Sequence, residues 1–295
     1  MEQISSLKST STSTSIHPDT HIGMVTLRVS QLARSLKYYV DILGFVVKEE
    51  TAGEASLGAE DGPALLRLVE VAGVPPQPRS ASGLYHVAIL LPTRMDLGRF
   101  LLHAAEAGLE IGQGDHIVSE ALYLSDPDEN GLEVYRDRPR SGWVWKNGLV
   151  NMGGGPVDVR GLIQGARQSG RPWQHMPTGT TVGHIHLRVG DTAQAQDFYH
   201  TILGFDVVQQ MSGALFISAG GYHHHIGLNS WESRGAGQTP RNTAGLEVYE
   251  ILVPNSAALQ PIQERLSTHG VSYEEQPHGL LVLDPWGNHI AIRYN

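Results

Sequence analysis

Cysteine is absent from the 295-residue sequence. This absence excludes disulfides, thiolate nucleophiles, iron–sulfur clusters and cysteine-ligated zinc. Basic residues are also in deficit, because 21 Lys and Arg stand against 30 Asp and Glu and give a formal net charge of −9. We therefore expect no nucleic-acid or membrane partner and favour a small molecule. Any metal must be held by histidine and carboxylate, and the sequence contains 15 His.

Long apolar runs are missing as well. The run at residues 87–91 is far shorter than the ~20 residues that cross a bilayer. The first 17 residues are rich in Ser and Thr and lack the apolar core of a secretory signal. We interpret residues 1–18 as a flexible tail and expect a cytoplasmic protein. A transit peptide is the alternative, although the tail contains no Arg.

An internal repeat organises the chain. The segment LRVSQLARSLKYYVDILGF at 27–45 returns as LRVGDTAQAQDFYHTILGF at 187–205, with nine of 19 positions identical and no gap. Each copy has the pattern of a strand, a helix and a second strand. We infer a duplication.

A second pair of segments extends the repeat to four modules. Residues 83–92 match 245–254, and residues 122–135 match 281–294, with a helical pattern between them in each case. The modules cover about 20–72, 83–137, 182–231 and 245–295, and each is predicted to be βαβββ. Because about 50 residues cannot bury a core alone, the modules must pair. We predict an α+β fold with two paired half-open barrels, in domains 19–137 and 182–295 joined by a linker at 138–181.

Several motifs resemble those of the vicinal oxygen chelate superfamily. They are SLKYYVDILGF at 35–45, HVAI at 86–89 and DPDENGLE at 126–133. That superfamily includes glyoxalase I, fosfomycin and bleomycin resistance proteins, and the type I extradiol dioxygenases. The resemblance covers nearly the whole chain after residue 18 and implies the fold predicted above. Four modules in one chain are typical of the dioxygenases.

Module 2 resembles the extradiol dioxygenase signature more specifically. Gly114 and His116 are followed after five residues by Leu122-Tyr123, then by the pair Asp126-Pro127 and by Glu133. One position departs, because Glu129 stands where that family prefers Gly. The resemblance is strongest to the catechol 2,3-dioxygenase subgroup. It implies an iron enzyme of aromatic catabolism that cleaves the ring of a small aromatic diol with O2.

The superfamily places metal ligands on the first and last strands of its modules. Here the first-strand positions hold Met24, His86, His184 and Val248, and the last-strand carboxylate position holds Glu133 in module 2 but Ala291 in module 4. Sequential pairing of modules would therefore leave neither barrel with three ligands. If module 2 pairs with module 3, the residues His86, Glu133 and His184 fall in one barrel. We predict this swapped pairing, with the barrel of modules 1 and 4 as structural support.

A set of two His and one carboxylate leaves positions open on Fe(II), and Mn(II) accepts the same set. We therefore expect Fe(II), with Mn(II) as the alternative, bound by His86, Glu133 and His184. The plain alternative is that each His is an ordinary polar residue of a strand. His186 shares the face of His184 by strand alternation and ranks second as a ligand.

The run Tyr222-His223-His224-His225 precedes an apolar alternation that ends module 3. The resemblance implies an acid–base His near this strand end, and alignment on the alternation favours His225, with His223 on its face. The choice among the three His stays open, and the run is alternatively a solvated turn or an adventitious metal binder. His116 and Tyr123 carry over from the signature as catalytic residues near the substrate, although Tyr123 is alternatively a core residue.

Two other functions remain open at this stage. One is a metal-dependent lyase or isomerase, which normally uses four protein ligands. The other is a metal-free protein that binds a small ligand, as the resistance proteins do. The sequence does not define the diol, and exposed edge strands leave a homo-oligomer open.

Overall fold

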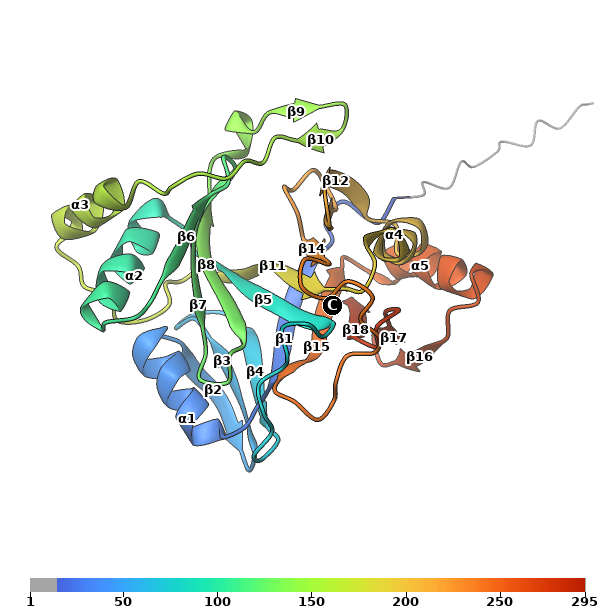
Figure 1. The fold of residues 1–295 in the computed structure, drawn as a ribbon, viewed down its shortest axis with the longest axis horizontal. Helices are drawn as coiled ribbons and strands as arrows, with labels where there is room; N and C mark the ends of the chain where they lie inside the picture. Colours follow the sequence, from blue (N-terminus) through green and yellow to red (C-terminus); the bar gives the residue numbers. More distant parts are fainter. Residues whose placement is uncertain (1–14, 295) are drawn as a thin grey trace, which may run out of the picture.

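The computed structural model describes residues 15–294, in which two eight-stranded mixed sheets carry helices on their outer faces (Figure 1). The strand order is β16-β17-β18-β15-β1-β4-β3-β2 in the first sheet, here called sheet A, and β12-β13-β14-β11-β5-β8-β7-β6 in the second, sheet B. This architecture confirms the predicted α+β fold of four βαβββ modules in two half-open barrels.

Each module contributes four strands and the helix after its first strand. Sheet A contains β1 (His21–Val29), β2 (Val46–Thr51), β3 (Glu54–Gly58), β4 (Ala64–Glu70), β15 (Gly245–Val253), β16 (Tyr273–Gln276), β17 (Gly279–Leu283) and β18 (His289–Tyr294). Sheet B contains β5 (Gly83–Leu90), β6 (Gly112–Asp115), β7 (Ser119–Ser125), β8 (Gly131–Asp137), β11 (Thr181–Arg188), β12 (Asp206–Met211), β13 (Ala214–Ser218) and β14 (Ile226–Asn229). The module helices are α1 (Leu32–Lys37), α2 (Arg94–Glu106), α4 (Thr192–Gln196) and α5 (Ser256–Thr268), and π-helical turns at Tyr38–Ile42 and Asp197–Ile202 extend α1 and α4.

The central strand pairs join modules that are distant in the sequence. β1 pairs antiparallel with β15, which joins modules 1 and 4, and β5 pairs antiparallel with β11, which joins modules 2 and 3. In Figure 1 these four strands lie at the centre of the molecule. Each sheet therefore contains strands from both halves of the chain. The predicted domains 19–137 and 182–295 do not coincide with the two sheets, and these domain limits stay a prediction.

Buried tyrosine–aspartate bonds tie consecutive modules together across the two sheets. The hydroxyl of Tyr39 in module 1 donates to Asp126 in module 2 (3.1 Å), and that of Tyr199 in module 3 donates to Asp284 in module 4 (2.8 Å). Asp126 Oδ1 also accepts from the backbone N–H of Asn130 (2.9 Å). These bonds fix the turn that leads into β8. Sheet pairing and the tyrosine–aspartate bonds together hold all four modules in one structure.

That turn contains the residue that departs from the signature. Glu129 has φ of +64°, whereas the equivalent position in module 4 is Gly287 with φ of +77°. A non-glycine residue in this conformation is strained by roughly 1 kcal/mol. The turn of module 2 therefore has the same left-handed backbone conformation as that of module 4, although it has Glu129 in place of a glycine.

The segment between the two repeats packs against sheet B. It contains the 3₁₀ turn Arg140–Gly142, the two-stranded pair β9 (Trp145–Lys146) and β10 (Leu149–Val150), and α3 (Val159–Ser169). Gly98 of α2 allows close contact, because a Cβ there would lie 2.4 Å from the carbonyl oxygen of Leu162 in α3. Figure 1 shows α2 and α3 side by side. Trp143 is buried and packs on Tyr222.

The start of the described chain is packed. Ile16 is buried, and its N–H donates to the carbonyl of Gly204 (2.7 Å). Ile16 is therefore packed although it falls within the predicted tail, whose first 14 residues lie outside the described residues. Within residues 15–294, no helix is long and apolar enough to span a membrane.

Candidate metal centre

Three adjacent strands of sheet B bring two histidines and a glutamate together. β5 lies between β8 and β11, and Ala88 of β5 is paired with Glu133 on one side and with His184 on the other. His86 stands two residues before Ala88 and so shares its face. The small side chain of Ala88 leaves room for the three longer side chains to converge above it.

The three side chains meet through one carboxylate oxygen. Oε2 of Glu133 lies 2.9 Å from Nε2 of His86 and 3.2 Å from Nε2 of His184. All three residues are buried, and their ligand atoms lie within 4.8 Å of one another. Among the described residues, this is the one group of at least three His, Cys, Asp or Glu side chains with such geometry.

The donor set fits a metal ion. Nε2 of His86 is buried and has no hydrogen-bond partner, although the carboxylate oxygen is close. A buried ring nitrogen without a partner costs free energy unless something else binds it. Two imidazoles and a carboxylate bind Fe(II), Mn(II) or Zn(II) at about 2.0–2.2 Å. These residues would hold the ion between them.

The ionisation states also suit a metal. Burial opposes ionisation of Glu133, but the adjacent imidazoles of His184 and His86 outweigh it and hold the pKa of the carboxyl well below its usual range. Burial lowers the pKa of His184 to about 4, against the opposing effect of Glu133. A carboxylate and a neutral imidazole are the forms that bind metals.

Ring packing orients His184. Its Nδ1 is buried and has no hydrogen-bond partner, so no carbonyl or carboxylate fixes the ring through that atom. The ring lies between Tyr135 and His224, with centroid separations of 4.8 and 4.1 Å. The hydroxyl of Tyr135 is in turn hydrogen-bonded to that of Tyr222 (2.7 Å).

A cavity of about 1100 Å³ opens over the three residues. Its walls come from both modules of sheet B and from the segment between the repeats. Besides the three candidate ligands, its lining includes His116, Tyr123, Met152, His186, Arg188, Phe216, His224 and Trp231. The volume is ample for a substituted benzene ring.

The two signature residues of module 2 lie in this cavity. The hydroxyl of Tyr123 is 2.6 Å from Nε2 of His116, and Nδ1 of His116 is 3.1 Å from the carbonyl oxygen of Gly153. A carbonyl only accepts, so Nδ1 carries the proton and Tyr123 donates to Nε2. Burial, then the charge of Glu133, raises the pKa of Tyr123 and keeps it protonated.

The three consecutive histidines point to different places. His224 lines the metal cavity and packs on His184 and Phe216. His223 is fully buried, with Nδ1 2.8 Å from Nδ1 of His224 and Nε2 2.8 Å from Oδ1 of Asp137. These contacts form a continuous chain from the cavity to the half-buried carboxylate of Asp137.

His225, which the sequence favoured as the acid–base residue, lies elsewhere. It is absent from the described lining of the metal cavity and lines a second cavity of about 880 Å³. Its Nδ1 accepts from the N–H of Ala219 (3.1 Å). β14 begins only at Ile226, so strand alternation does not apply to the residues before it. His224 is the histidine of this run that faces the metal site.

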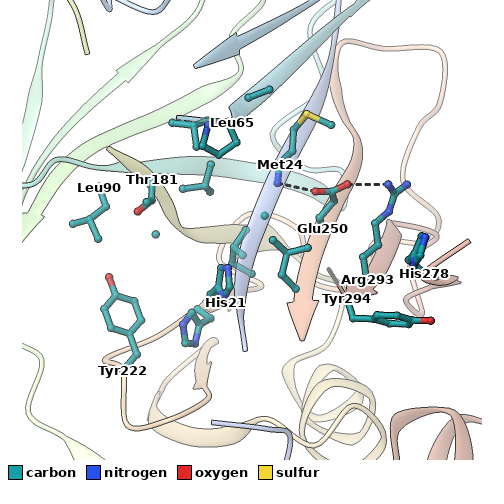
Figure 2. Close-up of a pocket in the computed structure, with 18 of the residues that line it drawn as sticks. His21, Met24, Leu65, Leu90, Thr181, Tyr222, Glu250, His278, Arg293 and Tyr294 are labelled. Carbon is teal, nitrogen blue, oxygen red and sulfur yellow. Dashed lines mark hydrogen bonds and ion pairs between the residues drawn. The ribbon is translucent and has the colours of Figure 1, made fainter. Parts of the chain in front are cut away.

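The second cavity is lined mainly by β1, β4, β15 and β18 of sheet A, with Leu90 and Thr181 from sheet B. Figure 2 shows Met24 and Glu250 on neighbouring strands at its wall, with Arg293 beyond them. Glu250 accepts from the N–H of Met24 (3.1 Å) and pairs with Arg293 (3.4 Å). Its carboxylate is therefore already engaged within the protein.

The sequence left His224 open among the three consecutive histidines. It gave no indication of two other residues near the site, Asp137 and Arg188. His186, which ranked second as a ligand, lines the cavity, and its Nε2 is bonded to Nδ2 of Asn229 (3.0 Å). The alternation His184, His186, Arg188 along β11 was the available signal for Arg188.

Comparison with known proteins places these features in a family. The model of the Glyoxalase/Bleomycin resistance protein/Dioxygenase superfamily matches residues 21–134 and 181–292. A catechol-2,3-dioxygenase of Bacillus subtilis (strain 168) is 47% identical over 277 residues, which cover 92% of this chain and 96% of that protein.

Solved structures resemble the chain in fold. Glyoxalase I from Zea mays has a TM-score of 0.57 at 16% identity, covering 94% of this chain and 92% of its own. The cppA protein from Streptococcus pneumoniae TIGR4 has a TM-score of 0.57 at 11% identity, covering 93% and 99%. At these identities the likeness extends to the fold alone.

Proposed function

The chain belongs to the glyoxalase/bleomycin resistance protein/dioxygenase superfamily, and we propose that it is an Fe(II) extradiol dioxygenase that cleaves a catechol-type ring with O2. The observation that carries this function is the convergence of His86, Glu133 and His184 without a fourth ligand among the described residues. The 47% identity to a catechol-2,3-dioxygenase over nearly the whole chain supports the same activity.

The three-residue set distinguishes this function from its alternatives. Two His and one carboxylate would hold a ferrous ion from one side, and the bound ion would supply open positions for a diol and O2. A lyase or isomerase of this superfamily would normally require a fourth protein ligand. A metal-free binding protein would leave the buried Nε2 of His86 without any partner.

His224 is the residue that we assign to proton transfer. Its Nδ1 is engaged by His223, so Nε2 is the nitrogen left for a bound diol. Burial and the surrounding imidazoles of His184, His223 and His186 lower its pKa well below the usual value. The ring is therefore neutral and able to accept a proton from the second hydroxyl of the diol.

Asp137 and His223 determine which nitrogen of His224 is the acceptor. A carboxylate can only accept, so Nε2 of His223 carries a proton that points toward Asp137. Nδ1 of His223 then accepts from Nδ1–H of His224. This leaves Nε2 of His224 with a free lone pair. The pair thus acts as a positioning device for the base.

Tyr123 and His116 supply the polar side of the ring pocket. Because Tyr123 donates to His116, its oxygen is left to accept from a substrate hydroxyl, and rotation of the hydroxyl turns it into a donor. Phe216 and Met152 line other parts of the cavity and offer apolar surface to the ring. The site would therefore hold the diol between two groups that can bear a proton.

Oxygen uptake tests this function directly. Protein reconstituted anaerobically with Fe(II) is given catechol, 3-methylcatechol and 4-methylcatechol in an oxygen-electrode cell, and absorbance is followed in parallel. We expect one O2 consumed per diol and a yellow ring-opened product. Mn(II) reconstitution identifies which metal sustains turnover. Absence of uptake across the panel, with metal bound, would contradict the proposal.

A further inference from the structure

Arg188 is a buried cation in the wall of the metal cavity. Its exposed fraction is 8%, and it lines the cavity at the end of β11. Its hydrogen bonding to the described residues is a single contact from Nη2 to Oε1 of Gln77 (3.1 Å). Nε is buried and has no partner. A guanidinium has five N–H donors, so this side chain is largely unsatisfied.

The internal repeat supplies a matched comparison. Arg28 stands 160 residues earlier at the equivalent position of β1 and is equally buried, with an exposed fraction of 2%. Nη1 of Arg28 binds Glu247 at 2.8 Å. Nη1 also donates to the carbonyl of Leu246, Nε to that of Thr243 and Nη2 to that of Pro240. In sheet A, this arginine therefore makes four hydrogen bonds, one of them to a carboxylate, against one for Arg188.

The difference between the two sheets comes from one aligned position. In the matching segments 83–92 and 245–254, Glu247 corresponds to Tyr85. Tyr85 lines the metal cavity and offers no carboxylate to Arg188. A buried cation without its partner is strongly destabilising, whereas a paired one is tolerated. The partner has been lost only in the sheet that contains the candidate metal centre.

The position of Arg188 suits the far end of a substrate. His184, His186 and Arg188 alternate along β11 and share one face. The Cα atoms of the first and last are separated by roughly 13 Å, at ~3.3 Å per residue. The arginine side chain is long, so its guanidinium can lie closer to the metal-binding residues than its Cα does. A diol ring with a short substituent would fit in the remaining distance.

Aromatic side chains line the part of the cavity between His184 and Arg188. Trp231 lies 5.7 Å from Tyr85 and 5.8 Å from His186 between ring centroids.

Two exposed charged residues, Arg79 and Glu232, also line the cavity near Arg188. Burial lowers the pKa of Arg188, and the charge of Glu232 partly opposes this effect. A guanidinium nevertheless stays charged at neutral pH.

We propose that Arg188 binds a carboxylate on the substrate, so that the physiological substrate is a catechol whose ring carries a short acidic substituent. The diol part of this inference rests on the proposed function, whereas the carboxylate contact does not need the metal. In the complex, the substrate carboxylate takes the place that Glu247 holds beside Arg28.

Paired substrates test the proposal in the Fe(II) enzyme. The acids 3,4-dihydroxyphenylacetate and 3-(3,4-dihydroxyphenyl)propionate are compared with their neutral amides by kcat/KM. We expect a preference for an acid of about 10- to 100-fold, the effect of one charge-assisted hydrogen bond pair. Arg188→Gln should reduce that ratio to near one. Tyr85→Glu, which restores the partner found in sheet A, should do the same.

Arg28→Gln is the matched control, because it removes the equivalent arginine from the other sheet. It should lower stability while leaving the acid-to-amide ratio as in the wild type. Equal kcat/KM for acids and amides in the wild type would overturn the proposal, as would a ratio that survives both Arg188→Gln and Tyr85→Glu.

A binding measurement separates this proposal from the proposed function. Calorimetry with metal-free protein and 3-phenylpropionate, which lacks the diol, should show binding that 3-phenylpropionamide does not. Arg188→Gln should abolish it. If the acid binds in this way but no diol is cleaved, the dioxygenase function fails while the carboxylate site stands. If diols are cleaved but neither acid preference nor acid binding is seen, the carboxylate site alone fails.

Discussion

Nε2 of His86 lies 2.9 Å from Oε2 of Glu133 and yet makes no hydrogen bond with it. The same oxygen is 3.2 Å from Nε2 of His184 and bonds to it. The ring of His86 is therefore left without a partner beside an oxygen that is bonded to His184. A metal ion bound by all three atoms would engage both rings.

Removal of the carboxylate should release the metal. Glu133→Ala and His184→Ala are each expected to reduce bound iron from about one ion per chain to less than about a tenth, because two ligands do not retain a labile divalent ion. Metal analysis after gel filtration measures this. His225→Asn is the control and should retain its iron. Stoichiometric iron in Glu133→Ala would contradict the ligand assignment.

The neighbouring histidines should separate by function. His224→Gln is expected to keep the metal but lose about 10²- to 10⁴-fold in kcat, the usual contribution of a positioned acid–base group. His225→Asn should turn over within about threefold of the wild type, because His225 lies in the other cavity and Asn can still accept from the N–H of Ala219. The reverse ranking of the two variants would restore His225 as the acid–base residue.

The choice among these histidines marks the limit of sequence reasoning. Alternation of side chains identifies a face only within a regular strand, and β14 begins after the run. The turn at residues 223–225 follows instead from contacts with Asp137 and with the ring of His184, which lie far away in the sequence. No local pattern encodes those contacts.

The fold and the three candidate ligands were more accessible. The repeat revealed four modules because its motifs recur without gaps, and strand alternation then defined equivalent positions in each. Met24 and Val248 cannot bind iron as histidine does, so the sequence argument united the same three residues that the structure brings together. The unpaired state of Arg188 could not be predicted from its own module. It arises because module 2 has Tyr85 at the position where module 4 has Glu247.

The tautomer of His224 should depend on Asp137. In Asp137→Asn, the new side-chain amide can donate a hydrogen bond as well as accept one. The variant therefore no longer forces the proton of His223 onto Nε2. We expect a loss of about tenfold or more in kcat with little change in KM or bound metal. Long-range ¹H–¹⁵N spectra of metal-free protein with labelled histidine should show His224 protonated at Nδ1 in the wild type and mixed in the variant. Identical spectra would rule out this positioning role.

Stability of the metal-free protein should fall in mild acid. Burial first, then the nearby imidazoles of His223 and His21, lowers the pKa of His225 to about 3, and that of His184 is lowered to about 4 chiefly by burial. Each takes up a proton on unfolding between that value and about 6.5. The free energy of unfolding is therefore at its full value above pH 6.5. It falls by about 1.4 kcal/mol per pH unit for each histidine, down to about pH 4 for His184 and about pH 3 for His225.

Urea unfolding at pH 7.5, 6, 5 and 4.5 measures this dependence. His225→Asn should flatten it by the contribution of one histidine, since the variant has no ring to protonate. A wild-type midpoint that stays constant from pH 7.5 to 4.5 would show that these rings are not held neutral by the fold.

Anomalous diffraction at the iron absorption edge, from crystals loaded anaerobically with Fe(II), tests the central claim most directly. We expect one peak at about 2.0–2.3 Å from Nε2 of His86, Nε2 of His184 and a carboxylate oxygen of Glu133. No other protein atom should be coordinated. A peak that lies away from these three residues, or that has a fourth protein ligand, would contradict it.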